Sequence, residues 1–166
     1  YNVSLDAFLQ LNTGQTPILY KQALQLANPT PTDIIWDCFS GIGIMSLIFA
    51  KKTKHVYGLE INSSAIQNAT QNATLNHIKN ITFIQHDLEK NPSPKLPKPT
   101  TIIVDPPRKG CSEAFLKNIT QQDPKKIIYI SCNPISLIRD LKILKNHQYK
   151  STNVQPIDMF PQTHHI

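Results

Sequence analysis

Ile34-Ile35-Trp36-Asp37-Cys38-Phe39-Ser40-Gly41-Ile42-Gly43 is the most informative stretch of the chain for its architecture. Three apolar residues predict a buried strand, and two glycines mark a tight turn before a helical apolar pattern that starts near residue 44. Gly41 and Gly43 allow the backbone to turn sharply and to lie close to a ligand. This strand-turn-helix unit is typical of nucleotide-binding sheets, although a plain connection between a strand and a helix has the same pattern.

Strand-like and helix-like segments alternate on either side of this unit. Such alternation predicts a mostly parallel sheet with helices on both faces, which is a doubly wound α/β fold. Asn62 or Ser63 is expected to cap one helix, and a Pro- and Lys-rich loop is expected at residues 91–99. The expected strands are residues 34–36, 55–60, 81–84, 101–104, 127–130 and 149–154, and the expected helices are residues 44–51, 62–76, 113–120 and 135–146.

Polar or reactive side chains follow five of the expected strands. Ligands of doubly wound sheets bind outside the carboxyl ends of the strands, so these side chains are expected to share one site. Glu60 lies where a carboxylate can accept hydrogen bonds from both hydroxyls of a ribose, which predicts a nucleotide-type ligand. The five residues are Asp37, Glu60, Asp87, Asp105 and Cys132.

Asp105-Pro106-Pro107-Arg108-Lys109-Gly110 forms the second motif. Two prolines fix the backbone just after a strand, so Asp105 and the neighbouring carbonyls are presented in one geometry that suits a flat polar base. Arg108 and Lys109 are candidate phosphate contacts. A rigid turn with solvated charges is the alternative.

Ser131-Cys132-Asn133-Pro134 forms the third motif. A thiol between a strand end and a helix N-terminus experiences a positive partial field that favours the thiolate, the nucleophilic form. Cys132 is therefore the candidate nucleophile, and an ordinary buried cysteine is the alternative. We interpret Cys38 as a packing residue and Cys111 as incidental.

Composition limits the class of protein. The 166 residues, 40% of them hydrophobic, suit one domain with a core, and no stretch approaches the ~20 apolar residues that span a bilayer. The net charge of +6 suits a polyanionic partner, and a lysine-rich surface explains it equally. Three scattered cysteines fit a reducing, cytoplasmic compartment and lack zinc spacing, and adjacent His164 and His165 do not share one ion easily, so no metal site is expected.

Together, these motifs resemble those of the RNA uracil-5-methyltransferases, which form 5-methyluridine in transfer and ribosomal RNA. The resemblance covers nearly the whole chain, and the joint occurrence of the Asp-Pro-Pro-Arg and Ser-Cys-Asn-Pro motifs is highly specific. The matching segments, in family order, are Phe8-Leu9-Gln10-Leu11-Asn12, Asp37 to Gly43, Gly58-Leu59-Glu60, Asp105 to Gly110, Ser131 to Pro134 and Asp158-Met159-Phe160-Pro161-Gln162-Thr163.

The resemblance implies a Rossmann-like class I methyltransferase fold over residues 1–166, with S-adenosylmethionine as cofactor and an RNA uridine as substrate. Cys132 would add to C6 of uracil and Asp105 would help to hold the base, which must be unstacked first. The residues expected at the cofactor are Gln10, Phe39, Gly41, Gly43, Glu60, Asp87 and Asp105, and those at the substrate are Arg108 and Lys109.

The chain begins with Tyr1 and stops at His165-Ile166, one residue before the glutamate that the family uses as proton-abstracting base. We therefore expect a fragment that lacks the last strand and an N-terminal RNA-binding domain, behaves as a monomer, and binds cofactor without completing turnover. Without the resemblance, an amphipathic segment that leads into the fold explains residues 8–15 as well as a cofactor contact does.

Three other functions remain open at this stage. An exocyclic-amine methyltransferase would use the Asp105 loop without a thiol, so a Cys132→Ser variant would keep its activity. A basic RNA-binding module with a vestigial pocket would not bind S-adenosylmethionine. A nicotinamide dehydrogenase is compatible with the glycine turn and with nothing else in the sequence.

Overall fold

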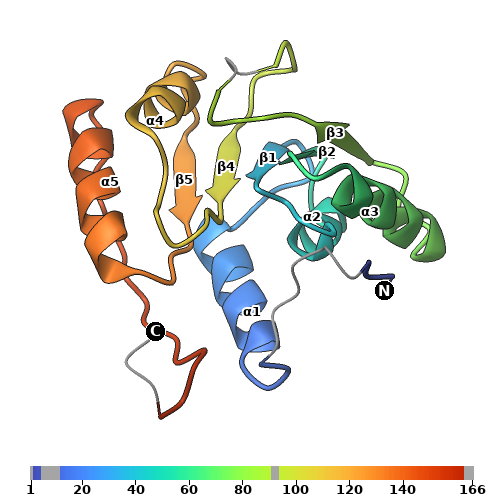
Figure 1. The fold of residues 1–166 in the computed structure, drawn as a ribbon. Helices are drawn as coiled ribbons and strands as arrows, with labels where there is room; N and C mark the ends of the chain where they lie inside the picture. Colours follow the sequence, from blue (N-terminus) through green and yellow to red (C-terminus); the bar gives the residue numbers. More distant parts are fainter. Residues whose placement is uncertain (1, 5–11, 91–93, 163–166) are drawn as a thin grey trace.

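The structure, a computed structural model, describes residues 2–4, 12–90 and 94–162. Within these ranges five strands form one sheet in the order β3-β2-β1-β4-β5, and all neighbouring strands are parallel. Helices cover both faces of the sheet (Figure 1), so the expected doubly wound α/β fold is confirmed. In chain order the elements are α1 (Thr16–Ala27), β1 (Ile34–Cys38), α2 (Ile44–Ala50), β2 (His55–Glu60), α3 (Ser63–Leu75), β3 (Ile81–Gln85), β4 (Thr101–Val104), α4 (Glu113–Thr120), β5 (Lys126–Tyr129) and α5 (Pro134–Asn146).

Side chains that alternate along the central strands build one core on each face of the sheet. Trp36 on β1 and Ile102 on β4 pack against α4 and α5, whereas Ile35 and Ile103 pack against α1 and α2. All four residues of β4 are buried. Such double coverage is what a parallel sheet requires, and it leaves the strand ends as the accessible edge.

The expected bounds of strands and helices agree with the structure to within two residues, except at the two places described below. Asn62 is the N-cap of α3, and its Oδ1 accepts hydrogen bonds from the amides of Ser64 and Ala65 at 2.9 and 3.2 Å. Asn133 caps α5 in the same way, since its side chain accepts from the amide of Ile135 at 3.0 Å. Side-chain caps give sharp helix starts, which is why sequence patterns located them well.

The expectation of a strand at residues 149–154 is wrong. These residues belong to the described part of the chain, form no strand, and are exposed from Lys150 onward. A strand is stable only when a neighbour pairs with it, and in the described residues β5 pairs with β4 alone. Within the described residues this segment pairs with no strand of the sheet, so the expected strand does not form.

The sequence analysis also did not identify helix α1. Its signals were a proline in the first turn and the alanines Ala23 and Ala27, which lie one helical turn apart and are buried against the sheet. Because α1 precedes β1 and covers the same face as α2, it completes the layer beneath the candidate site.

Candidate active site

The turn between β1 and α2 depends on its glycines. Gly41 and Gly43 have φ values of +53° and +82°, and Phe39 also adopts a positive φ of +64°. A side chain at Gly43 would place its Cβ 2.5 Å from the ring of Phe83. The turn therefore needs glycine both for backbone conformation and for close packing. The ring of Phe39 packs edge-on against Phe115, with 5.4 Å between ring centroids.

Glu60 ties this turn to the end of β2. One carboxylate oxygen accepts a hydrogen bond from the amide of Gly41 at 3.0 Å, and the other accepts from the amides of Ile61 and Asn62 at 2.8 and 2.9 Å. The carboxylate is thus held at the strand edge between two loops. Ile61 is 54% exposed and lines the same cavity, so an apolar surface lies directly beside the carboxylate. The sequence analysis did not single out Ile61; an apolar residue just after the strand-end glutamate was the available signal.

Asp87 follows β3, as expected, and organises its own loop. Its Oδ1 accepts from the amides of Glu89 and Lys90 at 3.1 and 3.2 Å, and its Oδ2 lies 3.6 Å from the Lys90 ammonium. The preceding strand end is joined to β2 through the amide of His86, which donates to the Glu60 carbonyl at 2.8 Å. Asp87 therefore lies at the same edge as Glu60, one strand further along the sheet.

Asp37 and Asp105 are two interacting carboxyl groups at the ends of neighbouring strands. Asp37 is buried and accepts a hydrogen bond from the Ser46 hydroxyl at 2.5 Å. Burial raises the pKa of Asp37 to about 7. Burial, together with the charge of Asp37, also raises the pKa of Asp105 to about 7. Asp105 lines the cavity, whereas Asp37 faces α2, so only Asp105 is placed to meet a ligand.

Cys132 lies in the short loop between β5 and α5. The loop is held by Ser131, whose hydroxyl accepts from the Asn133 amide at 3.1 Å. Cys132 is half-buried and lines the cavity, whereas Cys38 and Cys111 are buried. Cys38 belongs to the core, as expected. Burial raises the pKa of the Cys111 thiol to about 12, and the Cys111 backbone amide donates to the buried Asp140.

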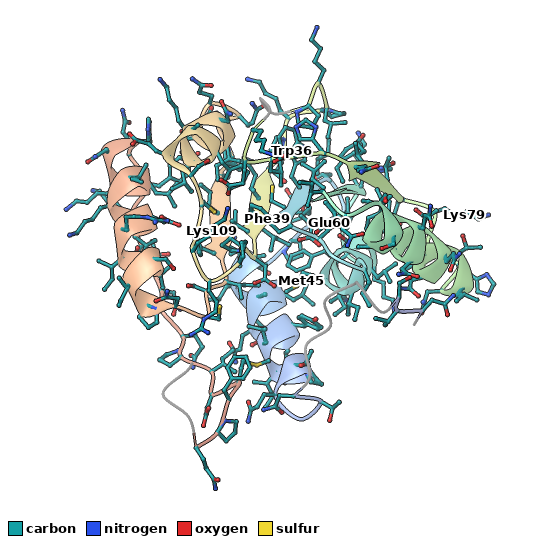
Figure 2. All side chains as sticks on the ribbon, viewed as in Figure 1. Trp36, Phe39, Met45, Glu60, Lys79 and Lys109 are labelled. Carbon is teal, nitrogen blue, oxygen red and sulfur yellow. The ribbon has the colours of Figure 1, made fainter. Side chains whose placement is uncertain are left out.

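One cavity of about 1500 Å³ takes in most of these groups at the carboxyl edge of the sheet and continues along β5 to Lys125 and Lys126 at the other end of that strand. Figure 2 shows Lys109, Phe39 and Glu60 in one row across the middle of the molecule, from the loop after β4 to the end of β2. Gly43 is buried beneath the turn and is not part of the lining, and Gln10 lies outside the described residues. The expected site residues that line the cavity are Phe39, Gly41, Glu60, Asp87, Asp105, Arg108, Lys109 and Cys132.

In the part of the chain that the structure describes, neither a cluster of metal-ligating side chains nor a membrane-spanning helix is found. No group of three or more His, Cys, Asp or Glu side chains is arranged to hold a metal ion there, and His164 and His165 lie outside it. None of the helices in those ranges has the length and apolarity to cross a bilayer.

Two sequence models of protein families match the chain. The model described as TRM5/TYW2 methyltransferase domain matches residues 24–121, which is more than half of the chain. The model described as tRNA (Uracil-5-)-methyltransferase matches residues 97–166, the part that holds Asp105 and Cys132. The chain belongs to the RNA methyltransferase family.

Curated relatives carry the same family name. An uncharacterized RNA methyltransferase of Halalkalibacterium halodurans is 44% identical over 173 residues, covering 100% of this chain and 37% of that protein. A second, from Listeria innocua, is 46% identical over 170 residues, with the same coverage of 100% and 37%. The chain thus spans less than two fifths of the length of these RNA methyltransferases.

Solved structures agree with this assignment. The tRNA (uracil-54, C5)-methyltransferase of Pyrococcus abyssi, in complex with S-adenosyl-L-homocysteine, matches with a TM-score of 0.83 and 30% identity, covering 96% of this chain and 38% of that one. Trm5b of Pyrococcus abyssi matches with a TM-score of 0.63 and 20% identity over 85% of this chain and 41% of that one, a likeness of fold alone. This member of the RNA methyltransferase family therefore has the Rossmann-like methyltransferase fold.

Proposed function

We propose that this chain is the catalytic domain of an enzyme that transfers a methyl group from S-adenosylmethionine to C5 of a uridine in tRNA or rRNA, with Cys132 as the nucleophile. The observation that carries the proposal is that a partly exposed thiol, a carboxyl group with a pKa near 7 and the Glu60 carboxylate line one cavity. The family match over residues 97–166 and the Pyrococcus abyssi neighbour support uracil C5 as the target.

The groups at the β1, β2 and β3 ends fit S-adenosylmethionine. The Glu60 carboxylate suits the ribose hydroxyls, and the exposed side chain of Ile61 with buried Leu88 offers an apolar surface for a base. Gly41 lets the backbone lie close to the ligand. When bound, the cofactor supplies an electrophilic methyl group on a sulfonium ion. Gln10 remains a predicted cofactor contact.

Cys132 supplies the covalent chemistry. C5 of uracil is a weak nucleophile, and addition of the Cys132 thiolate to C6 forms a C–S bond and makes C5 enolate-like. After C5 has gained the methyl group, a base removes the C5 proton, the C6–S bond breaks, and its electron pair returns to Cys132 as thiolate. The Cys132 thiolate is thus regenerated, and the C5–C6 double bond of the pyrimidine is restored.

Asp105 and the two cationic residues after it are assigned to the substrate. Because its pKa is about 7, the Asp105 carboxyl group can donate or accept a hydrogen bond at the polar edge of uracil near neutral pH. Arg108 and Lys109 are exposed at the rim of the cavity, where the phosphates of an unstacked nucleotide would pass.

The decisive experiment is mass spectrometry of the full-length protein after incubation with 5-fluorouridine RNA and S-adenosylmethionine. Fluorine at C5 blocks the final elimination, so a stable adduct at Cys132 is expected. Cys132→Ser should form no adduct, and Cys38→Ala, which removes a buried thiol, should form it normally. Absence of an adduct in the wild type, or its persistence in Cys132→Ser, would contradict the proposal.

A second candidate is methyl transfer to another position of a nucleobase through the Asp105 loop alone. The TRM5/TYW2 match favours it, because that match ends at residue 121 and does not include Cys132. Under this alternative, Cys132→Ser keeps its methyltransferase activity on the cognate RNA. The same variant therefore separates the two functions.

A further inference from the structure

Asp140 on α5 is a buried carboxylate that the proposed mechanism does not use. Its exposed fraction is 0%. Oδ2 accepts hydrogen bonds from the Tyr129 hydroxyl at 2.5 Å and from the Cys111 amide at 2.8 Å, and Oδ1 accepts from Nε of Arg139 at 2.8 Å. A buried carboxylate is tolerated only with such partners, so each of these bonds constrains where its donor lies.

Arg139 carries this constraint to the loop that begins at Asp105. It is one of only two arginines in the chain, and its guanidinium donates to the carbonyls of Lys109 and Cys111, each at 2.9 Å. Between these two residues, Gly110 has a φ of +73°, and a Cβ there would lie 2.6 Å from both Arg139 and Asp140. The loop backbone at Gly110 therefore packs directly against the ion pair of Arg139 and Asp140.

Two further bonds join the same loop to the segment that holds the thiol. The Asn133 side-chain amide donates to the Arg108 carbonyl at 3.0 Å, and the Ser136 hydroxyl donates to the same carbonyl at 3.1 Å. Asn133 directly follows Cys132, and Tyr129 ends the strand before it. The Tyr129 hydroxyl also lies 3.6 Å from Cys111 Sγ, to which it donates. Residues that precede and residues that follow Cys132 in the sequence are therefore both bonded to the Asp105 loop or to its continuation at Cys111.

We propose that Tyr129, Asn133, Ser136, Arg139 and Asp140, here called the loop clamp, are positioning residues that hold Asp105 and Cys132 at a fixed separation. This inference rests on the proposed function, because it assumes that both groups act on one base. Arg139 donates to backbone carbonyls on either side of Gly110. Tyr129 lines the cavity, whereas Arg139 and Asp140 do not, so the effect of this ion pair on the chemistry must pass through the loop.

The ion pair between Arg139 and Asp140 argues for positioning over stability, because only Asp140 is buried and the Arg139 side chain is 53% exposed. An ion pair with one partner open to solvent contributes little to stability. The pair instead makes several hydrogen bonds of defined geometry to one loop, at the carbonyls of Lys109 and Cys111 and the amide of Cys111. A misplacement of about 1 Å between reacting groups can cost roughly a hundredfold in rate.

The test uses the full-length protein and variants Arg139→Lys and Arg139→Gln, with Lys142→Gln, an exposed position on the same helix, as matched control. The rate of adduct formation with 5-fluorouridine RNA should fall about tenfold or more in both Arg139 variants, since neither side chain reproduces the planar guanidinium that bonds both carbonyls. The Kd for S-adenosylmethionine should stay within about twofold, because Glu60 and Gly41 belong to the β1–β2 half of the cavity. Lys142→Gln should change neither quantity.

A double variant tests whether the loop clamp acts as one unit. Asp140→Asn leaves Arg139 without its charge partner and should also slow adduct formation, whereas Arg139→Gln with Asp140→Asn should be no slower than the slower single variant. Rates that match the wild type, or that fall only in proportion to cofactor affinity or folded fraction, would overturn the positioning role and leave the proposed function intact. A wild-type protein that forms no adduct would overturn both.

Discussion

Asp105 is a carboxyl group of the site whose pKa is raised by burial and by a neighbouring charge. It follows β4 and lines the cavity, and its amide donates to the Cys38 carbonyl at 3.3 Å. Burial and the charge of Asp37 disfavour its ionised form, so its pKa rises to about 7. A carboxyl group in this state changes protonation near neutral pH.

Because the folded pKa of Asp105 lies above its unfolded value of about 3.9, the native state keeps a proton that the unfolded state has lost between about pH 4 and pH 7. This residue's stabilising contribution is therefore complete below pH 4 and is lost as the pH rises to 7. Asp105→Asn should remove that dependence. The free energy of unfolding from chemical denaturation at pH 4–8 checks this, with exposed Asp123→Asn as control. Equal pH slopes for wild type and Asp105→Asn would contradict it.

Glu60 is expected to matter for cofactor affinity. Glu60→Gln keeps the shape of the side chain but replaces the carboxylate that bonds the Gly41 amide and faces the cavity. Hydrogen bonds to a charged group contribute about 1.5–3 kcal/mol, so the Kd for S-adenosylmethionine should rise roughly tenfold or more. Isothermal titration calorimetry measures it, and Glu113→Gln on the exposed side of α4 is the control. An unchanged Kd in Glu60→Gln would exclude Glu60 from the cofactor site.

At the scale of single elements, β2 and β3 meet through a glycine and an aromatic ring. Gly58 is paired with Phe83 in the parallel register, and a Cβ at Gly58 would lie 2.4 Å from the Phe83 ring. The same ring fills the space beside Gly43 in the turn. One phenylalanine therefore sets both the spacing of two strands and the position of the glycine turn.

Gly58→Ala should destabilise the fold by about 1–3 kcal/mol, because the Phe83 ring must leave its place to admit a methyl group. Thermal or chemical denaturation measures the loss. Gly14→Ala is the matched control, since the nearest atom to its added Cβ would be 3.6 Å away. Phe83→Leu, which replaces the ring with a smaller side chain, should recover part of the lost stability when it is combined with Gly58→Ala. Equal stability of Gly58→Ala and Gly14→Ala would contradict the packing argument.

The elements also show where sequence patterns succeed. The bounds of α4 and of β2 follow from a Ser cap and from apolar alternation, and both were predicted to the residue. Residues 149–154 were also expected to form a strand and form none, because pairing comes from a neighbour that lies elsewhere in the chain. Local signals locate helix ends well, whereas strand formation at a sheet edge depends on long-range contacts.

At the scale of the whole molecule, the net charge of +6 and the open cavity fit an RNA substrate. Arg108 and Lys109 are exposed at the cavity rim. Lys79, which is also exposed, lies at the far end of the molecule from Lys109 (Figure 2). Removing the charge of Lys109 or of Lys79 changes the net charge equally, so a comparison of the two variants separates the effect of a local phosphate contact from the effect of net charge.

RNA affinity should fall as salt rises, because contact with phosphates releases bound counterions. Lys109→Gln should weaken binding and reduce the slope of log K against log salt by about 0.7–1, the value for one phosphate contact. Lys79→Gln should leave the slope unchanged. Filter binding of the full-length protein to a cognate RNA between about 50 and 200 mM salt makes the comparison. Equal slopes for the two variants would place the RNA away from Lys109.

The sequence alone determined the order of the five strands and of helices α2 to α5, the glycine turn and the strand-end residues, because periodicity, caps and turn chemistry act over a few neighbouring residues. The three-dimensional fold was needed for the remainder. The interaction of Asp37 with Asp105, the packing of Phe83 against two glycines, and the hydrogen bonds from Arg139 and Asp140 to the Asp105 loop join residues from 25 to 68 positions apart. Such contacts depend on how distant elements pack, and no local pattern encodes that packing.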